Sequence, residues 1–198
     1  MTTNDVVLER MHESQNSKTM LGFWIYLMTD CVLFASLFAT YAVLHGNTFG
    51  GPTSKDIFDL PFVLIETLIL LTSSFTAGLA ILSLRAGKRT QMMSWFAVTF
   101  VLGLTFLIME LTEFSQLAAE GNSWSHSAFL SAFFTLVGTH GLHIATGLFW
   151  MIVLLVQAMK KGLTESVSRR LTMLSMFWHF LDIIWIFIFT IVYLMGVL

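Results

Sequence analysis

The chain has 198 residues, of which 56% are hydrophobic and only 11% are charged, with a formal net charge of -2. Soluble domains carry about 25% charged residues, so this composition excludes an ordinary soluble globular protein and favours an integral membrane protein. The single cysteine, Cys31, excludes an internal disulfide and a cysteine-rich metal site. The net charge gives no reason to expect a nucleic-acid partner.

The first nineteen residues are polar and carry several charges. We expect them to form a short cytoplasmic tail, because a cleavable secretory signal has a shorter apolar core and a small-residue cleavage site. The remaining residues, 20–198, are then expected to form a single membrane domain.

Five apolar spans follow the tail and are separated by polar or basic turns. In chain order, helices are predicted over residues 20–44, 61–84, 92–117, 128–159 and 171–195. Each span reaches the length of about 20 residues that a helix needs to cross a bilayer. The strands of a membrane barrel would alternate polar and apolar residues, which these spans do not. The sequence therefore predicts an all-α membrane protein with five transmembrane helices.

The basic residues predict the orientation of the five helices. In a five-span chain, nine of the ten fall on one side, namely Arg10, Lys18, Arg85, Lys88, Arg89, Lys160, Lys161, Arg169 and Arg170. Only Lys55 falls on the other side. Because basic residues accumulate on the cytoplasmic side, the amino terminus is predicted to be cytoplasmic and the carboxyl terminus periplasmic.

Eight ionisable side chains lie inside the predicted spans, whereas every lysine and arginine lies outside them. These residues are Asp30, Glu66, Glu110, Glu113, His140, His143, His179 and Asp182. A charge at the centre of a bilayer costs about 2.5 to 3.5 kcal/mol on insertion scales, so each of these groups must face protein or water, or stay neutral. We therefore expect the helices to pack against one another and against a partner.

The positions of these residues along their helices predict two layers. At about 1.5 Å of rise per residue, a middle layer holds five of them: Asp30, His140, His143, His179 and Asp182. A layer nearer the periplasmic side holds Glu66, Glu110 and Glu113. Because the second layer contains three acids and no base, we expect a cation from another chain to compensate its negative charge.

The stretch "GTHGLHIATG" predicts a helix with two different faces. At about 100° per residue, His140 and His143 share one face, and the small residues Gly138, Gly141 and Ala145 share roughly the opposite one. Small residues allow the backbone of another helix to approach closely, while imidazoles can form hydrogen bonds with a different neighbour.

Three interpretations compete for the histidines. The pair His140 and His143 together with His179 could bind zinc, copper or iron, or a haem could lie between histidines of two helices. A lone HxxH is a weak motif, and membrane di-iron sites need many more histidines. We favour the third interpretation, in which the histidines form interhelical hydrogen bonds and the chain has no metal, cofactor or catalytic site. Asp30 is either a proton relay or, as we favour, a structural acid.

Three stretches resemble a known family. "GFWIYLMTDCVLFASLFATY", "FLSAFFTLVGTHGLHIATG" and "FWHFLDIIWIFIFTIVYLMG" are similar to helices of subunit III of the haem-copper respiratory oxidases. The combination of GTHGLH with WHFLDxxW, in this order, is highly specific, and the resemblance runs from about Leu21 to the end of the chain. The five-helix form and the loop "GGPTSKDIFDLP" look most like the ubiquinol oxidases of the cytochrome o type, while cytochrome c and menaquinol oxidases stay as alternatives.

This resemblance implies a non-catalytic subunit of a bacterial inner-membrane complex that couples quinol oxidation to the reduction of oxygen to water. The haems and copper are then expected in the catalytic subunit I. This chain is expected to stabilise subunit I and to support its proton uptake. Subunits II and IV are the further expected partners. The family also implies a V-shaped helix arrangement with phospholipid in its cleft.

Within this resemblance two acids depart from the family pattern. Asp30 stands where other members have a buried glutamate that reacts with a carbodiimide, so the shorter acid puts that reactivity in doubt. Glu110 stands where the seven-helix relatives carry glutamine. The resemblance places the other candidates at matching family positions, namely Glu113, His140, His143, His179 and Asp182. Two other functional classes stay open. One is a transporter that conducts protons along the buried acids, and the other is a stand-alone membrane metalloenzyme. Broken helices and internal repeats, which are frequent in transporters, are not evident in the sequence.

Overall fold

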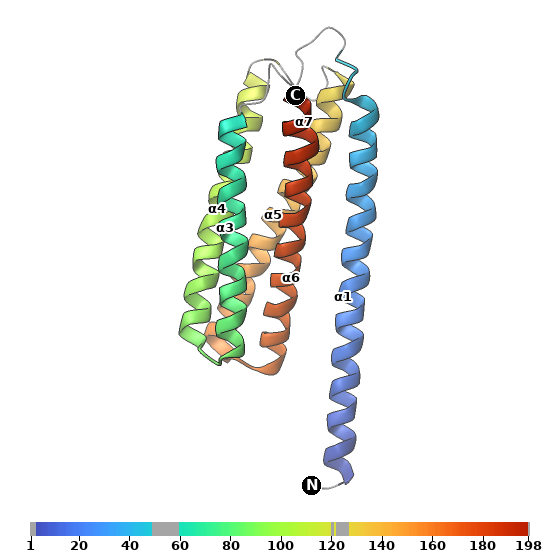
Figure 1. The fold of residues 1–198 in the computed structure, drawn as a ribbon. Coiled ribbons are helices and arrows are strands. Elements are labelled where there is room, and N and C mark those ends of the chain that lie inside the picture. The colour runs from blue at the N-terminus through green and yellow to red at the C-terminus, as the bar shows by residue number, and fades with distance from the viewer. Residues whose placement is uncertain (1–2, 49–59, 120, 122–126, 198) are drawn as a thin grey trace.

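The computed structural model describes residues 3–48, 60–119, 121 and 127–197, and the side chains in these ranges from Ser17 onward. These residues form helices and short turns (Figure 1). The long helices are α1 (Thr3–Leu44), α3 (Leu60–Arg85), α4 (Arg89–Ala119), α5 (Ala128–Lys161) and α6 (Glu165–Ile188). The last continues through a π-helix, η1 (Phe189–Leu194), into α7 (Met195–Val197). Within the described residues, five helical segments are long and apolar enough to cross a membrane, which confirms the predicted helical class with five candidate spans.

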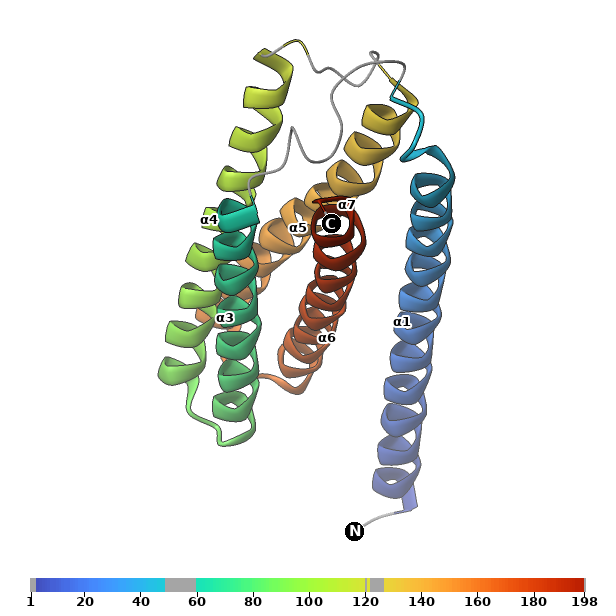
Figure 2. The same cartoon turned by 45° about the horizontal axis from the view of Figure 1, so that its top comes forward.

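The helices run roughly side by side, with α6 near the centre (Figure 1). Helix α6 packs against α1, α3 and α5, while α3 and α4 form a close antiparallel pair. Helix α5 crosses the bundle obliquely, as Figure 2 shows. Helix α1 lies at the edge, packs chiefly on α5 and α6, and extends beyond the other helices at its amino-terminal end (Figures 1 and 2).

Local sequence signals explain where several helices begin and end. The hydroxyl of Ser127 accepts a hydrogen bond from the backbone N–H of Leu130 at 3.1 Å, so α5 begins with a satisfied donor. Thr164 caps α6 in the same way. Helix α5 ends at Lys161 and is followed by the cap residue Gly162, whose φ of 72° lies in the left-handed region that glycine adopts at little cost.

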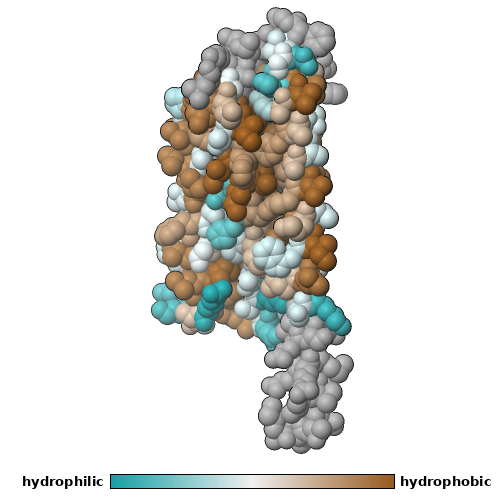
Figure 3. Space-filling model, turned by 45° about the vertical axis from the view of Figure 1, so that its right-hand side comes forward, coloured by the Kyte–Doolittle hydropathy of each residue, from teal (hydrophilic) through white to brown (hydrophobic). Residues whose placement is uncertain are grey.

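The turns after α3 and after α5 lie at the same end of the bundle (Figure 1). Arg85 ends α3, Arg89 begins α4 and Lys161 ends α5, so basic residues collect at this end. Figure 3 shows hydrophilic side chains at this end and a broad apolar belt above them. The predicted loops on the opposite side fall largely on residues 49–59 and 122–126, so they and Lys55 lie outside the described residues.

An aromatic core joins the four later helices. Trp178 of α6 is fully buried, and its ring fills the space that two glycines leave open. A Cβ atom at Gly103 of α4 would lie 2.6 Å from Cζ2 of Trp178, and one at Gly147 of α5 would lie 3.1 Å from its Cζ3. The indole N–H donates to Oγ of Ser73 in α3 at 3.1 Å. One side chain thus holds α6 against three neighbouring helices.

Candidate functional site

The eight ionisable residues within the spans occupy three polar groups and one separate position. The α1–α5 pair consists of Asp30 and His143, the α3–α6 network of Ser74, His179 and Asp182, and the carboxyl cluster of Glu66, Glu110 and Glu113; His140 stands apart. The predicted middle layer is therefore divided into the α1–α5 pair, the α3–α6 network and the separate His140.

The α1–α5 pair connects the edge helix to the bundle. Nε2 of His143 lies 3.8 Å from Oδ2 of Asp30, which is 7% exposed. Nδ1 of His143 lies 2.7 Å from the carbonyl oxygen of Thr139 and must carry the proton there, because a carbonyl oxygen only accepts. The ring of Phe34 lies 5.3 Å from the imidazole and shields the pair. His143 is thus fixed by its own helix and presents its other nitrogen to Asp30.

The α3–α6 network centres on one hydroxyl. Oγ of Ser74 lies 2.6 Å from Nδ1 of His179, and the same hydroxyl interacts with the carboxyl group of Asp182. Asp182 is 8% exposed, and its Oδ1 has no hydrogen-bond partner among the described residues. Ser74 therefore links a histidine and an acid of α6 to α3, and leaves one carboxyl oxygen unsatisfied.

His140 is enclosed completely. Its Nε2 donates to the carbonyl oxygen of Leu181 at 3.2 Å, which ties α5 to α6. Phe106 and Trp185 pack against the imidazole with ring centroids at 5.9 and 5.1 Å. In the described part of the chain, no three His, Cys, Asp or Glu side chains come close enough to share a metal ion. His140 therefore forms an interhelical hydrogen bond between α5 and α6.

The carboxyl cluster lies between α3 and α4. Glu66 and Glu110 are 0% and 1% exposed, and neither carboxyl group has a hydrogen-bond partner among the described residues. The phenol of Tyr193 in η1 donates to Oε2 of Glu113 at 3.0 Å. A Cβ atom at Gly141 would lie 2.8 Å from Oε1 of Glu110, so the small-residue face of α5 makes room for this acid.

The three acids are close enough to interact electrostatically. The cluster brings together all three residues of the predicted outer layer. An ionised carboxylate at this depth costs several kcal/mol unless a positive charge or donors compensate it. A cluster of this kind can hold protons or accept a donor from a neighbouring chain.

Sequence reasoning missed the hydroxyl groups that join α3 to its neighbours. Trp185 of α6 donates to Oγ1 of Thr67 at 3.0 Å, and the hydroxyls of Thr76 and Thr99 lie 2.8 Å apart. The run "TSSFT" at 72–76, inside an otherwise apolar span, was the signal that could have found some of them. No such signal marked the π-helix that brings Tyr193 to the carboxyl cluster.

Comparison with known proteins gives a consistent result. The profile of the family described as cytochrome c oxidase subunit III matches residues 3–197. The chain is 59% identical over 190 residues to the cytochrome bo(3) ubiquinol oxidase subunit 3 of Pseudomonas aeruginosa, covering 96% of this chain and 90% of that relative. It is 56% identical over 187 residues to the protein of the same name from Pseudomonas putida, covering 94% and 90%. The cytochrome c oxidase subunit 3 of Bacillus sp. (strain PS3) is 45% identical over 188 residues, covering 95% and 91%. The resemblance inferred from the motifs is confirmed.

Proposed function

From the premise that this chain belongs to the cytochrome c oxidase subunit III family, we propose that it is the non-catalytic subunit III of a ubiquinol-oxidising terminal oxidase. The observation that carries this proposal is the high identity, over nearly the whole of both chains, to relatives named as ubiquinol oxidase subunits. A cytochrome c oxidase relative matches at lower identity, so the ubiquinol branch is favoured over the cytochrome c branch.

In such a complex two ubiquinol molecules are oxidised to ubiquinone while one oxygen molecule is reduced to two water molecules. This four-electron chemistry requires metal cofactors, which we place in the catalytic subunit I. The role of this chain is to stabilise subunit I and to support its proton uptake, with subunits II and IV and membrane lipids as further neighbours. Its own buried histidines and acids contact neighbouring helices, which supports a structural role for several of them.

We place the chain in the bacterial inner membrane with a cytoplasmic amino terminus and a periplasmic carboxyl terminus. Arg85, Arg89 and Lys161 lie at one end of the bundle, which supports this orientation through the preference of basic residues for the cytoplasmic side. Residues 1–19 then form a cytoplasmic extension and residues 20–198 form a single membrane domain.

Purification through an affinity tag on this chain tests the proposal. From native membranes in a mild detergent, the tagged chain is expected to co-purify with a haem-bearing subunit and to show ubiquinol-driven oxygen consumption. Activity with reduced cytochrome c but not with ubiquinol would move the chain to the cytochrome c branch. Proton flux through vesicles that contain only this chain would favour a transporter and overturn the proposal.

A further inference from the structure

The carboxyl cluster contains two acids that the molecule encloses completely. Glu66 and Glu110 are 0% and 1% exposed, and all four of their carboxyl oxygens are buried without a hydrogen-bond partner among the described residues. Glu113 differs from them, because it is 9% exposed and its Oε2 accepts a hydrogen bond from the phenol of Tyr193 at 3.0 Å. The two enclosed acids therefore need a compensation that Glu113 already has in part.

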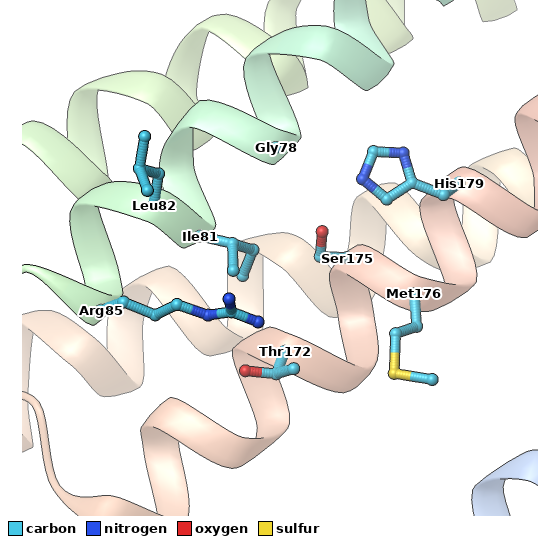
Figure 4. A pocket seen from close by; sticks show the side chains of 8 residues that line it. All are labelled: Gly78, Ile81, Leu82, Arg85, Thr172, Ser175, Met176 and His179. Atoms are coloured by element: carbon cyan, nitrogen blue, oxygen red, sulfur yellow. The ribbon is translucent and has the colours of Figure 1, made fainter.

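The described cations of this chain are too far away to supply that compensation. They lie at the opposite end of the membrane spans, and they are Lys18, Arg85, Lys88, Arg89, Lys160, Lys161, Arg169 and Arg170. At about 1.5 Å of rise per residue, Arg85 lies about 28 Å from Glu66 along α3. Figure 4 shows the guanidinium group of Arg85 extended into a surface hollow beside Thr172. A cation of another chain cannot reach Glu66 or Glu110 directly either, because their carboxyl oxygens are enclosed.

The described neutral donors next to the cluster form other hydrogen bonds. The hydroxyl of Thr67 donates to the carbonyl oxygen of Val63 at 2.8 Å, and the indole of Trp185 donates to that hydroxyl at 3.0 Å. The phenol of Tyr193 donates to Glu113. An ionised carboxylate can only accept hydrogen bonds. Three ionised acids would therefore face one another with this phenol as their donor among the described residues.

Helix α5 makes room for one of the acids without bringing a charge to it. A Cβ atom at Gly141 would lie 2.8 and 2.9 Å from the two carboxyl oxygens of Glu110, so the glycine leaves the space that this group occupies. His140, the neighbouring residue, donates from Nε2 to the carbonyl oxygen of Leu181 and interacts electrostatically with His143. The packing thus fits the shape of a carboxyl group closely and offers it no opposite charge among the described residues.

Protons would remove both difficulties. A buried carboxyl group without a counter-charge becomes neutral rather than staying ionised in a medium of low dielectric constant. Acids that share a site also oppose each other's ionisation, and Glu66, Glu110 and Glu113 are close enough to interact in this way. A neutral carboxyl group brings an O–H donor, so it can donate to another acid of the cluster.

We propose that the carboxyl cluster is a proton-binding site, in which Glu66 and Glu110 each hold a proton at neutral pH and Glu113 carries the single negative charge. Glu113 is the acid that best tolerates the charge, because it is the most exposed of the three and accepts the hydrogen bond of Tyr193. This inference goes beyond the proposed function, since it depends on packing within this chain.

Infrared spectroscopy of the purified complex tests the two protonation states, because the carbonyl stretching band of a protonated carboxylic acid is separate from the bands of a carboxylate. The spectrum of the unsubstituted complex minus that of Glu66→Gln, recorded at neutral pH, is expected to show a protonated-acid band that shifts in heavy water. Glu110→Gln is expected to give a second band of this kind. The matched control is Glu165→Gln, at an exposed acid in the first turn of α6, which should remove only a carboxylate band.

The midpoint of thermal unfolding keeps the test decisive if a variant assembles poorly. Glutamine has nearly the shape of a protonated glutamate and no charge, so Glu66→Gln and Glu110→Gln are expected to keep the midpoint of the unsubstituted complex. A carboxylate band in place of the protonated-acid band for either variant contradicts the proposal. Loss of the folded chain on either substitution, but not on Glu165→Gln, also contradicts it, because the site would then require a negative charge.

Tyr193→Phe tests the charge on Glu113. Phenylalanine keeps the ring that packs against Phe133 and Trp185 but removes the donor. Without the phenol, Glu113 is expected to take up a proton at neutral pH. The spectrum should then gain a protonated-acid band that is absent when Glu113→Gln is added to Tyr193→Phe. An unchanged protonated-acid region would show that Glu113 is not the charged member of the cluster.

The result can be separated from that of the proposed function. Failure of the unsubstituted chain to co-purify with a haem-bearing subunit overturns the proposed function, whereas the infrared bands can still be recorded on the full chain. A complex that consumes oxygen with ubiquinol, but shows only carboxylate bands for Glu66 and Glu110, leaves the function standing and rejects this inference.

Discussion

Glycine positions within the helices decide how closely aromatic rings and acids can approach neighbouring backbones. At Gly103 the ring of Trp178 occupies the space of the missing side chain, with two ring carbons at 2.6 and 2.7 Å from an ideal Cβ position. At Gly22, in α1, nothing lies within 4 Å. The same residue type thus has two different consequences, and only the contacts distinguish them.

We predict that Gly103→Ala destabilises the chain. The new methyl group would meet the indole of Trp178, which is held by neighbours and cannot move away easily. Overpacking of a filled core costs about 1 to 3 kcal/mol. This cost exceeds or cancels the gain of about 1 kcal/mol in helix propensity from glycine to alanine. The measurement is the midpoint of thermal unfolding in detergent. Gly22→Ala is the matched control and is expected to leave this midpoint unchanged or to raise it. Equal midpoints for both variants would mean that the ring of Trp178 moves without cost.

At the scale of the elements, α3 and α6 are joined by hydroxyl groups on one helix and ring N–H groups on the other. Trp178 donates to Ser73 and Trp185 donates to Thr67, so two indoles of α6 form hydrogen bonds with hydroxyl groups of α3. Ser73 also donates to the carbonyl oxygen of Thr99, which extends the contact to α4. Because lipid tails are as apolar as the helix surfaces, such hydrogen bonds and close packing replace the hydrophobic effect as the force between these helices.

A double-mutant cycle on Thr67→Val and Trp185→Phe measures one of these contacts. We expect a coupling free energy of about 0.5 to 1.7 kcal/mol, the range found for interhelical hydrogen bonds in membranes. The readout is the free energy of unfolding in mixed detergent. Thr72→Val serves as the control partner, because the hydroxyl of Thr72 donates to Leu68 of its own helix. The coupling free energy between Thr67 and Trp185 should exceed that between Thr72 and Trp185. If the two coupling free energies are equal, the interhelical hydrogen bond is contradicted.

At the scale of the whole molecule, α1 is the helix with the fewest ties to the rest. It packs chiefly on α5 and α6, and the pair of Asp30 and His143 is its polar contact with α5 near mid-membrane. The ring of Phe34 packs against the same histidine. Loss of the imidazole of His143 would therefore first weaken the packing of α1 against α5.

We predict that His143→Leu loosens the oxidase complex without altering its haem absorption spectrum. Leucine replaces an imidazole nitrogen that lies 3.8 Å from a buried carboxyl oxygen of Asp30, and this oxygen has no hydrogen-bond partner among the described residues. The acid then faces an apolar side chain, so this chain should dissociate from the complex at lower temperature or detergent concentration. The measurements are the amount of this chain that stays with the complex and the haem spectrum. His45→Leu, at an exposed histidine at the end of α1, is the control. A missing haem band in an otherwise intact complex would mean that His143 binds haem and that the structural interpretation is wrong.

The sequence by itself determined the membrane class, the number of helices and the family. Long apolar spans leave helices as the stable way to satisfy the backbone in lipid, and the spacing within GTHGLH and WHFLDxxW identifies the helices that carry them. These properties depend on residues near one another in the chain, so one sequence is enough to establish them.

Only the tertiary structure decided which polar residues meet. Depth along the helices placed His143, His179 and Asp30 in one layer, but the rotation of each helix sends His143 towards α1 and His179 towards α3. The π-helix shifts Tyr193 onto Glu113, a contact that a regular helical repeat does not anticipate. Rotation and register depend on how all the helices pack together, and in lipid that packing is set by small differences in shape between surfaces of equal polarity.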